Sequence, residues 1–182
     1  MASFLLLKPR LTNKKISLRI RLRLCNAYVT NIFMYNSEIW TLTKKLENDI
    51  DVFQRKLLRY ILNRFYPKNI SNIALYKVTR QTPWTSVIRT RRIRWTGHML
   101  RLNHEVQCHK ALDVYKTHNG KLKRRNFRTW IGQINKDLQS IGVDGTIWDT
   151  GVRTLAADRD SWRRVVDSST YSRVLDDTSW ES

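Results

Sequence analysis

The segment TKKLENDIDVFQRKLLRYILN, residues 43–63, contains the clearest periodic pattern in the chain. Its large apolar residues recur every three or four positions and are Leu46, Ile50, Phe53, Leu57 and Ile61. This is the period of an α-helix with one apolar face, and Thr43 stands where an N-cap is expected. The segment therefore predicts a helix from about Thr43 to Asn63 whose apolar face is buried.

A second helix is predicted on the N-terminal side, from about Ile16 to Tyr35. Its apolar stripe is formed by Ile16, Ile20, Leu24, Tyr28, Ile32 and Tyr35. The first part, residues 18–24, alternates apolar and basic residues and could also form a strand. We favour the helix because the helical period continues through the whole segment and the alternation does not.

Further helices are predicted on the C-terminal side. Ser71 can cap a short helix that runs to Val78, and Thr82 followed by Pro83 indicates the start of a helix that reaches Leu102. The expected core stripe of this second helix comprises Trp84, Ile88, Trp95, Met99 and Leu102.

The last third of the chain also shows apolar residues at helical spacing and residues that can cap helices. An amphipathic stripe runs from Phe127 to Ile141 and is stopped by Gly142. Asp158 and Asp160 can cap a short last helix, and a polar, frayed tail is expected from Ser168 onward. With few Gly and Pro residues between these segments, the sequence predicts a mainly α fold, a bundle of about five to six helices arranged as one body or two small lobes.

The charge of the chain is strongly positive and unevenly distributed. Lys and Arg number 34 against 15 acidic residues, which gives a formal net charge of +19. Residues 1–128 carry a net +22 and residues 129–182 a net −3. Such a balance is typical of proteins that bind the phosphate backbone of RNA or DNA, and it predicts that the binding surface lies in the first two-thirds.

Two basic clusters are the candidate nucleic-acid contacts, because Arg and Lys pair with phosphate oxygens. The candidates are Arg89, Arg91, Arg92, Arg94, Arg101, Lys121, Lys123, Arg124, Arg125 and Arg128. Trp84, Trp95 and Trp130 lie near them and could stack on bases, but their positions on apolar stripes favour a place in the core.

Several other functions are disfavoured. Cys25 and Cys108 are the only cysteines and show no metal or disulfide spacing, which indicates a reducing compartment, nuclear or cytoplasmic. The apolar run Phe4–Leu7 is too short for a signal peptide or a membrane span, although a basic helix lying on anionic lipid stays an alternative. No small-molecule substrate or cofactor is expected.

Catalytic and metal sites are also not expected. Asp176 and Asp177 are adjacent, as in polymerases, but lack a strand-hairpin pattern around them. A zinc site built from His98, His104, Cys108, His109 and His118 would match no standard finger spacing, and the sequence leaves it open.

An ordered series of short motifs resembles the region downstream of the polymerase palm in non-LTR (LINE-type) retrotransposon reverse transcriptases. The motifs are IFMYNSEIW at 32–40, LLRYIL at 57–62, ISN at 70–72, IRWTGHMLR at 93–101, KDL at 136–138 and LAADRDSWR at 155–163. The resemblance implies a thumb-like helical segment over 1–66, a basic helix and basic loop region over 67–128, and a C-terminal helical segment with a frayed tail over 129–182.

The resemblance also implies a function. The parent polyprotein is an RNA-directed DNA polymerase with an endonuclease, and we expect the palm and endonuclease to be absent here, so that the chain is not an enzyme by itself. It would bind RNA or DNA through the backbone. The alternative is a structural or protein-interaction remnant whose partners are the missing polymerase lobes. Asn36 stands where the family tends to have Gly, and 121–128 lacks the family's Gly and Pro.

Overall fold

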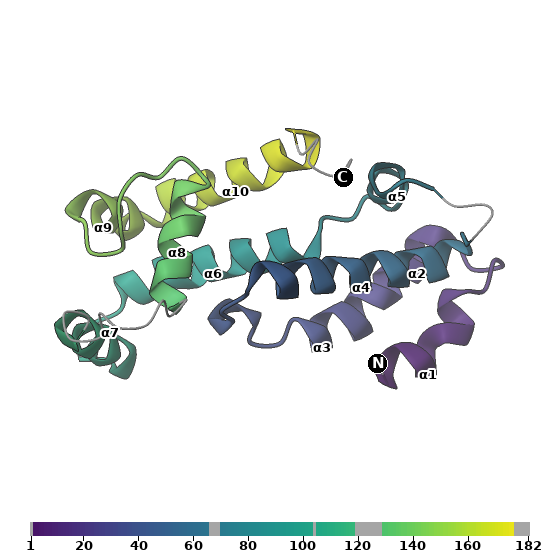
Figure 1. The fold of residues 1–182 in the computed structure, drawn as a ribbon, viewed down its shortest axis with the longest axis horizontal. Coiled ribbons are helices and arrows are strands. Elements are labelled where there is room, and N and C mark those ends of the chain that lie inside the picture. The colour runs from purple at the N-terminus through teal and green to yellow at the C-terminus, as the bar shows by residue number, and fades with distance from the viewer. Residues whose placement is uncertain (1, 66–69, 104, 119–128, 177–182) are drawn as a thin grey trace. The chain divides into compact units, whose positions relative to one another are not determined.

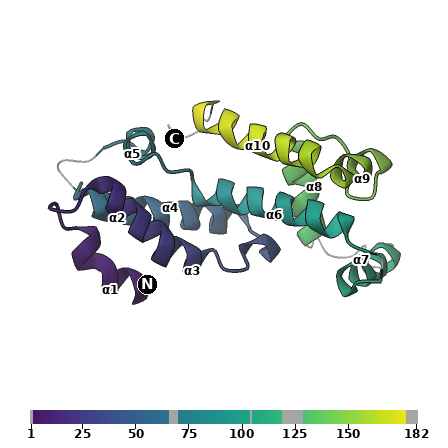
Figure 2. The ribbon, with the colours of Figure 1, turned by 180° about the vertical axis from the view of Figure 1, so that it is seen from behind.

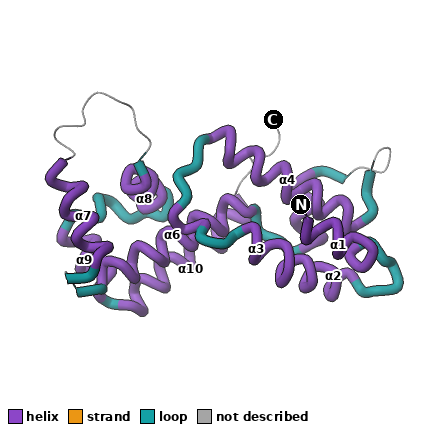
Figure 3. The backbone as a smooth tube through the Cα atoms, turned by 90° about the horizontal axis from the view of Figure 1, so that it is seen from below, coloured by secondary structure: helices purple, strands orange, loops and turns teal. Residues whose placement is uncertain are grey.

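A computed structural model describes residues 2–65, 70–103, 105–118 and 129–176. Those residues form helices joined by loops and turns, with no strand among them, so the chain is mainly α (Figure 3). They group into two compact units. Within the described ranges, unit 1 comprises residues 2–37, 42–65 and 70–88, and unit 2 comprises residues 38–41, 89–103, 105–118 and 129–176. The three segments predicted from the sequence divide the chain differently, because the boundary of the units falls between Ile88 and Arg89.

The helices of unit 1 begin with α1 (Ala2–Leu11), which the sequence did not predict, and α2 (Leu18–Cys25). A π-helical turn (Asn26–Thr30) and α3 (Asn31–Phe33) continue α2, so the strand alternative for residues 18–24 is wrong. The unit also contains α4 (Lys44–Leu62) and α5 (Asn72–Thr79), and α2 packs against both α1 and α4 (Figure 1).

The ends of α4 and α5 follow local sequence signals. The Thr43 side chain accepts a hydrogen bond from the Leu46 N–H at 3.1 Å, and Asn63 ends α4 in the left-handed conformation. The Ser71 side chain accepts a hydrogen bond from the Ala74 N–H at 3.2 Å at the start of α5. These predicted caps are confirmed. Ile50, Leu57 and Ile61 are buried as expected, whereas Leu46 is exposed.

The predicted apolar face of the Ile16–Tyr35 helix is wrong. Four residues of the stripe are exposed, namely Ile20, Tyr28, Ile32 and Tyr35. The buried residues of this segment are instead Leu22, Cys25 and Val29, together with Met34 after α3. Apolar side chains occupy two faces of the segment, and packing against α1 and α4 selects the second face.

The helix α6 (Trp84–Arg101) begins without the predicted Thr82 N-cap. Its first N–H groups bond instead to side chains of α4: the Trp84 N–H donates to Gln54 Oε1 at 2.8 Å, and the Thr85 N–H donates to Asp51 Oδ1 at 3.1 Å. Trp84 also stacks on Phe33, with ring centroids 4.6 Å apart. Residues distant in sequence therefore fix the start of α6.

Unit 2 contains the rest of α6, then α7 (Gln107–His118), α8 (Trp130–Gln139), α9 (Thr150–Ala157) and α10 (Arg159–Asp176); Figure 2 shows α9 leading into α10. The Thr129 side chain caps α8 by accepting the Gly132 N–H at 3.1 Å, and Asp158 accepts the Asp160 N–H at 3.0 Å before α10. The prediction that the last helix is short is wrong, because α10 extends to Asp176.

The core of unit 2 consists of buried apolar side chains from all five helices and from the loop between α8 and α9, which contributes Ile147. They are Ile93, Met99, Leu112, Ile131, Ile134, Leu138, Ile147, Val152, Ala156, Trp162 and Val166. The stripe predicted on α8 is thus confirmed at Ile131, Ile134 and Leu138; Trp130 and Ile141 are half-buried, and Phe127 lies outside the described residues. On α6 the prediction is confirmed for Met99 but not for Trp95, which is 37% exposed.

Candidate nucleic-acid interface

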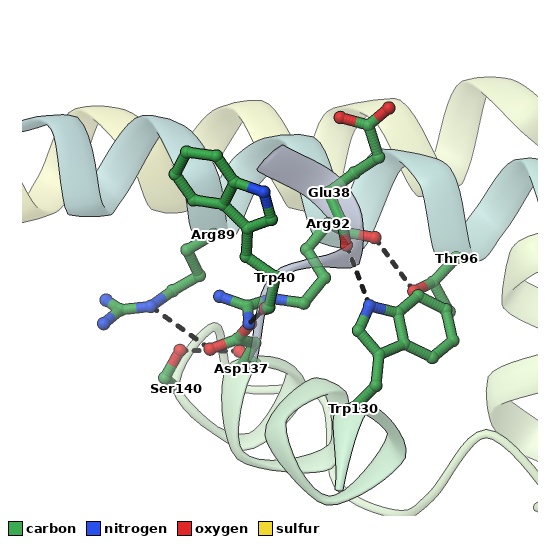
Figure 4. Close-up of polar contacts among 8 residues, drawn as sticks. All are labelled: Glu38, Trp40, Arg89, Arg92, Thr96, Trp130, Asp137 and Ser140. Atoms are coloured by element: carbon green, nitrogen blue, oxygen red, sulfur yellow. Dashed lines mark hydrogen bonds and ion pairs between the residues drawn. The ribbon is translucent and has the colours of Figure 1, made fainter. Parts of the chain in front are cut away.

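Two of the predicted phosphate contacts on α6 face a buried carboxylate. The Arg92 side chain is 1% exposed, with Nε 2.8 Å from Asp137 Oδ2, and its Nη1 donates to the Trp40 carbonyl at 2.8 Å. Arg89 is 28% exposed, with Nε 3.3 Å from Asp137 Oδ1. Figure 4 shows both guanidinium groups directed at this one carboxylate on α8. Arg92 is therefore an internal residue that joins α6 to α8.

The Arg92–Asp137 contact is an ion pair rather than an aligned hydrogen bond. The two atoms are close, but Arg92 Nε and Asp137 Oδ2 do not meet the angular requirement of a hydrogen bond. The attraction is still strong, since both groups lie in a low-dielectric environment. Beside it, Trp130 Nε1 donates to the Glu38 carbonyl at 2.8 Å, so Trp130 holds the 38–41 segment and is half-buried.

The other predicted cations of α6 also have contacts within unit 2 or limited exposure. Arg94 Nη2 lies 2.6 Å from Asp167 Oδ1 in a pair whose side chains are 57% and 44% exposed. Arg101 Nη1 donates to the Ala156 carbonyl at 2.7 Å. Arg91 is half-buried. Of this set, only Arg94 presents most of its side chain to solvent.

The Gly and Trp motifs of the sequence meet in the core of unit 2. Trp162 of α10 packs on the backbone of α6 at Gly97, where an added Cβ would lie 2.2 Å from the indole Nε1. That Nε1 donates to the Ile93 carbonyl at 3.2 Å. The glycine therefore permits the close approach of the tryptophan, so this part of the motif series is explained by packing.

The second predicted cluster, Lys121, Lys123, Arg124, Arg125 and Arg128, lies outside the described residues. These five cations stay candidates on the sequence alone.

A basic surface that the sequence analysis did not single out lies at the start of unit 1. Residues 1–37 contain seven Lys and Arg and no Asp or Glu. The Arg21 side chain is internal, donating from Nε to the Ile16 carbonyl and from Nη1 to the Leu11 and Ile61 carbonyls. The other six cations are exposed, and none forms an ion pair within the described part of the chain: Lys8, Arg10, Lys14, Lys15, Arg19 and Arg23. We call these six residues the N-terminal basic surface.

An open hollow of about 450 Å³ lies along α4 in the same unit. Three cations and two aromatic residues contribute to its lining, which comprises Val52, Arg55, Lys56, Arg59, Tyr60 and Phe65. Lys8 Nζ lies 5.3 Å from the centroid of the Tyr60 ring, so the N-terminal basic surface reaches the lining of the hollow. Cations beside aromatic rings are a combination that suits phosphates and unpaired bases.

The proposed zinc ligands do not form a site in the described residues. A ring nitrogen of the buried His109 lies 2.8 Å from the Met99 carbonyl, and His98 is exposed beside Trp95. No group of three or more metal-binding side chains is found within the described ranges. His104, whose placement is not described, and the side chain of His118 lie outside this test.

The two cysteines differ in environment. Cys25 is buried in unit 1, and burial raises the pKa of its thiol to about 11. Its reactive thiolate is therefore disfavoured at neutral pH. Cys108 on α7 is half-buried and also free.

Comparisons of the chain with protein-family models, curated proteins and solved structures found no match. Among the described residues, no helix combines the length and apolar character needed to cross a bilayer. The argument for function therefore rests on the residues and contacts of the chain itself.

The N-terminal basic surface could have been found in the sequence. Its signal is the complete absence of acidic residues over 37 positions, rather than a high local density of cations. The cations of α6 are more densely spaced in the sequence, but the density of cations does not distinguish a solvent-facing cation from one paired with a remote carboxylate such as Asp137.

Proposed function

We propose that this chain binds RNA or DNA through the phosphate backbone and performs no catalytic step by itself. The supporting observation is the N-terminal basic surface, six exposed cations in a segment without any acidic residue. Exposed cations can each displace a counterion from nucleic acid, and this release supplies affinity without reading base sequence.

The contacts divide into two kinds. Lys8, Arg10, Lys14 and Lys15 lie at the end of α1 and in the loop before α2, where they can follow a phosphate backbone. In the hollow on α4 the exposed Lys56 accompanies Tyr60 and Phe65, which suits a single strand whose bases are unpaired. The other two cations of its lining are less available, because Arg55 is buried and Arg59 donates to Asn72 Oδ1. Arg94 in unit 2 is a separate candidate contact and the 121–128 cations remain candidates from the sequence alone, while the buried Arg92 is not included.

We further propose that the chain derives from the region downstream of the palm in a non-LTR retrotransposon reverse transcriptase. The motif series and the helical character support this origin, and a nuclear or cytoplasmic location follows from it. The internal roles of Gly97 and Trp162 fit a segment in which the family motifs maintain the fold. Magnesium-dependent primer extension by the purified chain would contradict the non-catalytic part of the proposal.

The binding experiment compares two triple variants that remove the same charge from unit 1. Arg10, Lys14 and Lys15 are changed to Ala in the first, and the exposed Lys44, Lys45 and Lys77 are changed to Ala in the second. Fluorescence anisotropy with labelled single-stranded RNA and an RNA/DNA hybrid measures the affinity of each.

We expect the first variant to bind at least about tenfold more weakly than the wild type, and more weakly than the second variant. Equal losses in the two variants would show that only total charge matters and would contradict the assigned surface. No binding by the wild type at low salt would contradict the proposed function.

Because Arg92 is buried, a triple variant that includes it is not a suitable control for the binding experiment. Changing Arg91, Arg92 and Arg94 together to Ala would leave the Asp137 carboxylate without its closest cation. Such a variant would lose folding stability, and its loss of binding could not be assigned to a missing phosphate contact.

A further inference from the structure

The exposed face of the α2–α3 segment in unit 1 has no partner among the described residues. Ile20, Tyr28 and Ile32 are 50%, 55% and 62% exposed. Leu24, which lies between Ile20 and Tyr28 at the same spacing of four, is half-buried. We call these four residues the exposed stripe. Side chains four positions apart lie on the same side of a helix, so the stripe is a continuous apolar row.

The π-helical turn aligns this row. The Asn31 N–H donates to the Asn26 carbonyl, five residues earlier, in the middle of the segment. A π turn contains more residues than an α turn, so positions four apart drift less around the axis than they would in a regular helix. Tyr28 and Ile32 therefore continue the line started by Ile20 and Leu24. Inserted π turns are frequent at functional sites.

The stripe is narrow and has a basic border. Arg19 and Arg23 are exposed one turn apart beside Ile20 and Leu24, and Asn26 and Asn31 are exposed farther along. A narrow apolar row with charged borders is the surface that a helix presents to another helix in a helical pair. A bilayer surface instead favours a wide apolar face.

The charge of the segment specifies the partner. Residues 1–37 contain no acidic side chain that could neutralise Arg19 and Arg23. A second copy of this chain would bring the same cations together, and the described residues of unit 1 include 15 basic and only 3 acidic side chains. Like charges across a helix pair oppose association, whereas opposite charges favour it.

From these observations we propose that the exposed stripe is a docking surface for an amphipathic helix of another protein, whose apolar face is bordered by Asp or Glu. The aliphatic Ile20, Leu24 and Ile32 pack against the apolar face of the partner, and its carboxylates pair with Arg19 and Arg23. Three of the four residues of the exposed stripe are aliphatic and therefore poor stacking partners for bases, so nucleic acid is the less suitable occupant of the stripe, although Arg19 and Arg23 also belong to the N-terminal basic surface. This inference goes beyond the proposed function and stands without it.

The test uses two synthetic amphipathic helices as probes. Both have Leu along one face; one has Glu at the flanking positions and the other has Lys. Binding to the full chain is measured by fluorescence anisotropy of the labelled peptide at moderate salt. We expect the Glu peptide to bind and the Lys peptide to bind at least about tenfold more weakly.

Matched variants separate this surface from others in unit 1. Ile32→Glu places a charge in the exposed stripe, and Val78→Glu does the same at a 55% exposed position on α5. We expect only Ile32→Glu to weaken binding of the Glu peptide to the chain, by at least about tenfold. Arg19→Glu with Arg23→Glu should transfer the preference to the Lys peptide, whereas Lys44→Glu with Lys45→Glu should not. Circular dichroism checks that each variant keeps its helices.

Four outcomes would overturn the proposal. They are no binding of either peptide, equal binding of both, equal effects of Ile32→Glu and Val78→Glu, and a loss with Ile32→Glu confined to phosphatidylserine vesicles or single-stranded RNA. The last outcome would assign the stripe to lipid or nucleic acid instead.

Discussion

At the scale of single residues, cations with similar sequence contexts have different roles. Arg92 and Arg94 are two positions apart on α6, yet Arg92 is buried against Asp137 and Arg94 is exposed beside Asp167. Charge density along the sequence cannot distinguish them, because the distinguishing carboxylates lie 45 and 73 positions away. The structure therefore assigns Arg92 to the fold and leaves Arg94 available at the surface.

This difference predicts unequal effects on stability. Asp137→Ala leaves Arg92 buried without its carboxylate, and we expect the unfolding free energy to fall by about 3–5 kcal/mol. Asp167→Ala breaks only an exposed pair, for which we expect about 0–1 kcal/mol. Urea unfolding followed by circular dichroism measures both. Similar losses in the two variants would contradict the assignment of Asp137 as an internal anchor.

A second residue-scale prediction concerns Asp51 of α4. Its carboxylate accepts hydrogen bonds from the Thr85 N–H and hydroxyl at 3.1 and 2.6 Å. Burial raises the pKa of Asp51 above 3.8, and this effect exceeds the lowering by the Thr85 hydrogen bonds. The folded chain therefore holds this proton more tightly than the unfolded chain does.

The sign of the pH effect follows from that shift. The stability contributed by protonating Asp51 is fully present below pH 3.8, the unfolded value, and is lost as pH rises through the folded-state pKa. The Asp51→Asn variant has an amide at this position, which does not titrate, and it therefore serves as the reference. We expect the unfolding free energy of the wild type, relative to this variant, to fall as pH rises from below 3.8 toward neutrality. A difference that stays constant or rises with pH would contradict this account.

At the scale of elements, local signals predicted helix ends well. The predicted caps at Thr43, Ser71 and Asp158 need only nearby N–H groups, so a few residues of sequence specify them; the cap at Thr129 has the same local form but was not predicted. The position of the start of α6 was predicted to within a residue by Thr82 and Pro83, but the groups that bond its first N–H groups could not be predicted, because they belong to Gln54 and Asp51 of another helix.

The buried face of a helix proved harder to predict than its existence. The α2–α3 segment has apolar residues on two faces, and the longer stripe is the exposed one. Packing on α1 and α4 and the π turn together decide the outcome, and neither is visible in the period of the sequence. Because only one of the two apolar faces packs within unit 1, the exposed stripe on the other face is available for a partner.

The packing of α10 on α6 gives an element-scale prediction. In Gly97→Ala the new Cβ would overlap the Trp162 ring, so we expect unfolding of unit 2 to become easier by about 1–3 kcal/mol. Gly151 in α9 has nothing within 4 Å of an added Cβ. Gly151→Ala should therefore be neutral or stabilising, by up to about 1 kcal/mol. Thermal unfolding compares the two, and destabilisation by Gly151→Ala as large as that of Gly97→Ala would contradict the packing argument.

At the scale of the whole molecule, the sequence predicted the mainly α class and the excess of positive charge. The described residues of both units are basic, with net charges of +12 for unit 1 and +3 for unit 2. The candidate site was only partly predictable, since the cations of residues 8–23 are recognisable only by their exposure and by the lack of nearby acidic residues. The structure thus moves the centre of the proposed interface from α6 to the N-terminal basic surface.

The most direct test of this account is the salt dependence of binding to single-stranded RNA. For the wild type we predict that the logarithm of the association constant falls linearly with the logarithm of salt concentration. Changing Arg10, Lys14 and Lys15 to Ala should reduce the magnitude of that slope by about two, since each lost phosphate contact removes about 0.7. A slope that is unchanged in this variant, or binding that does not depend on salt, would contradict the central claim.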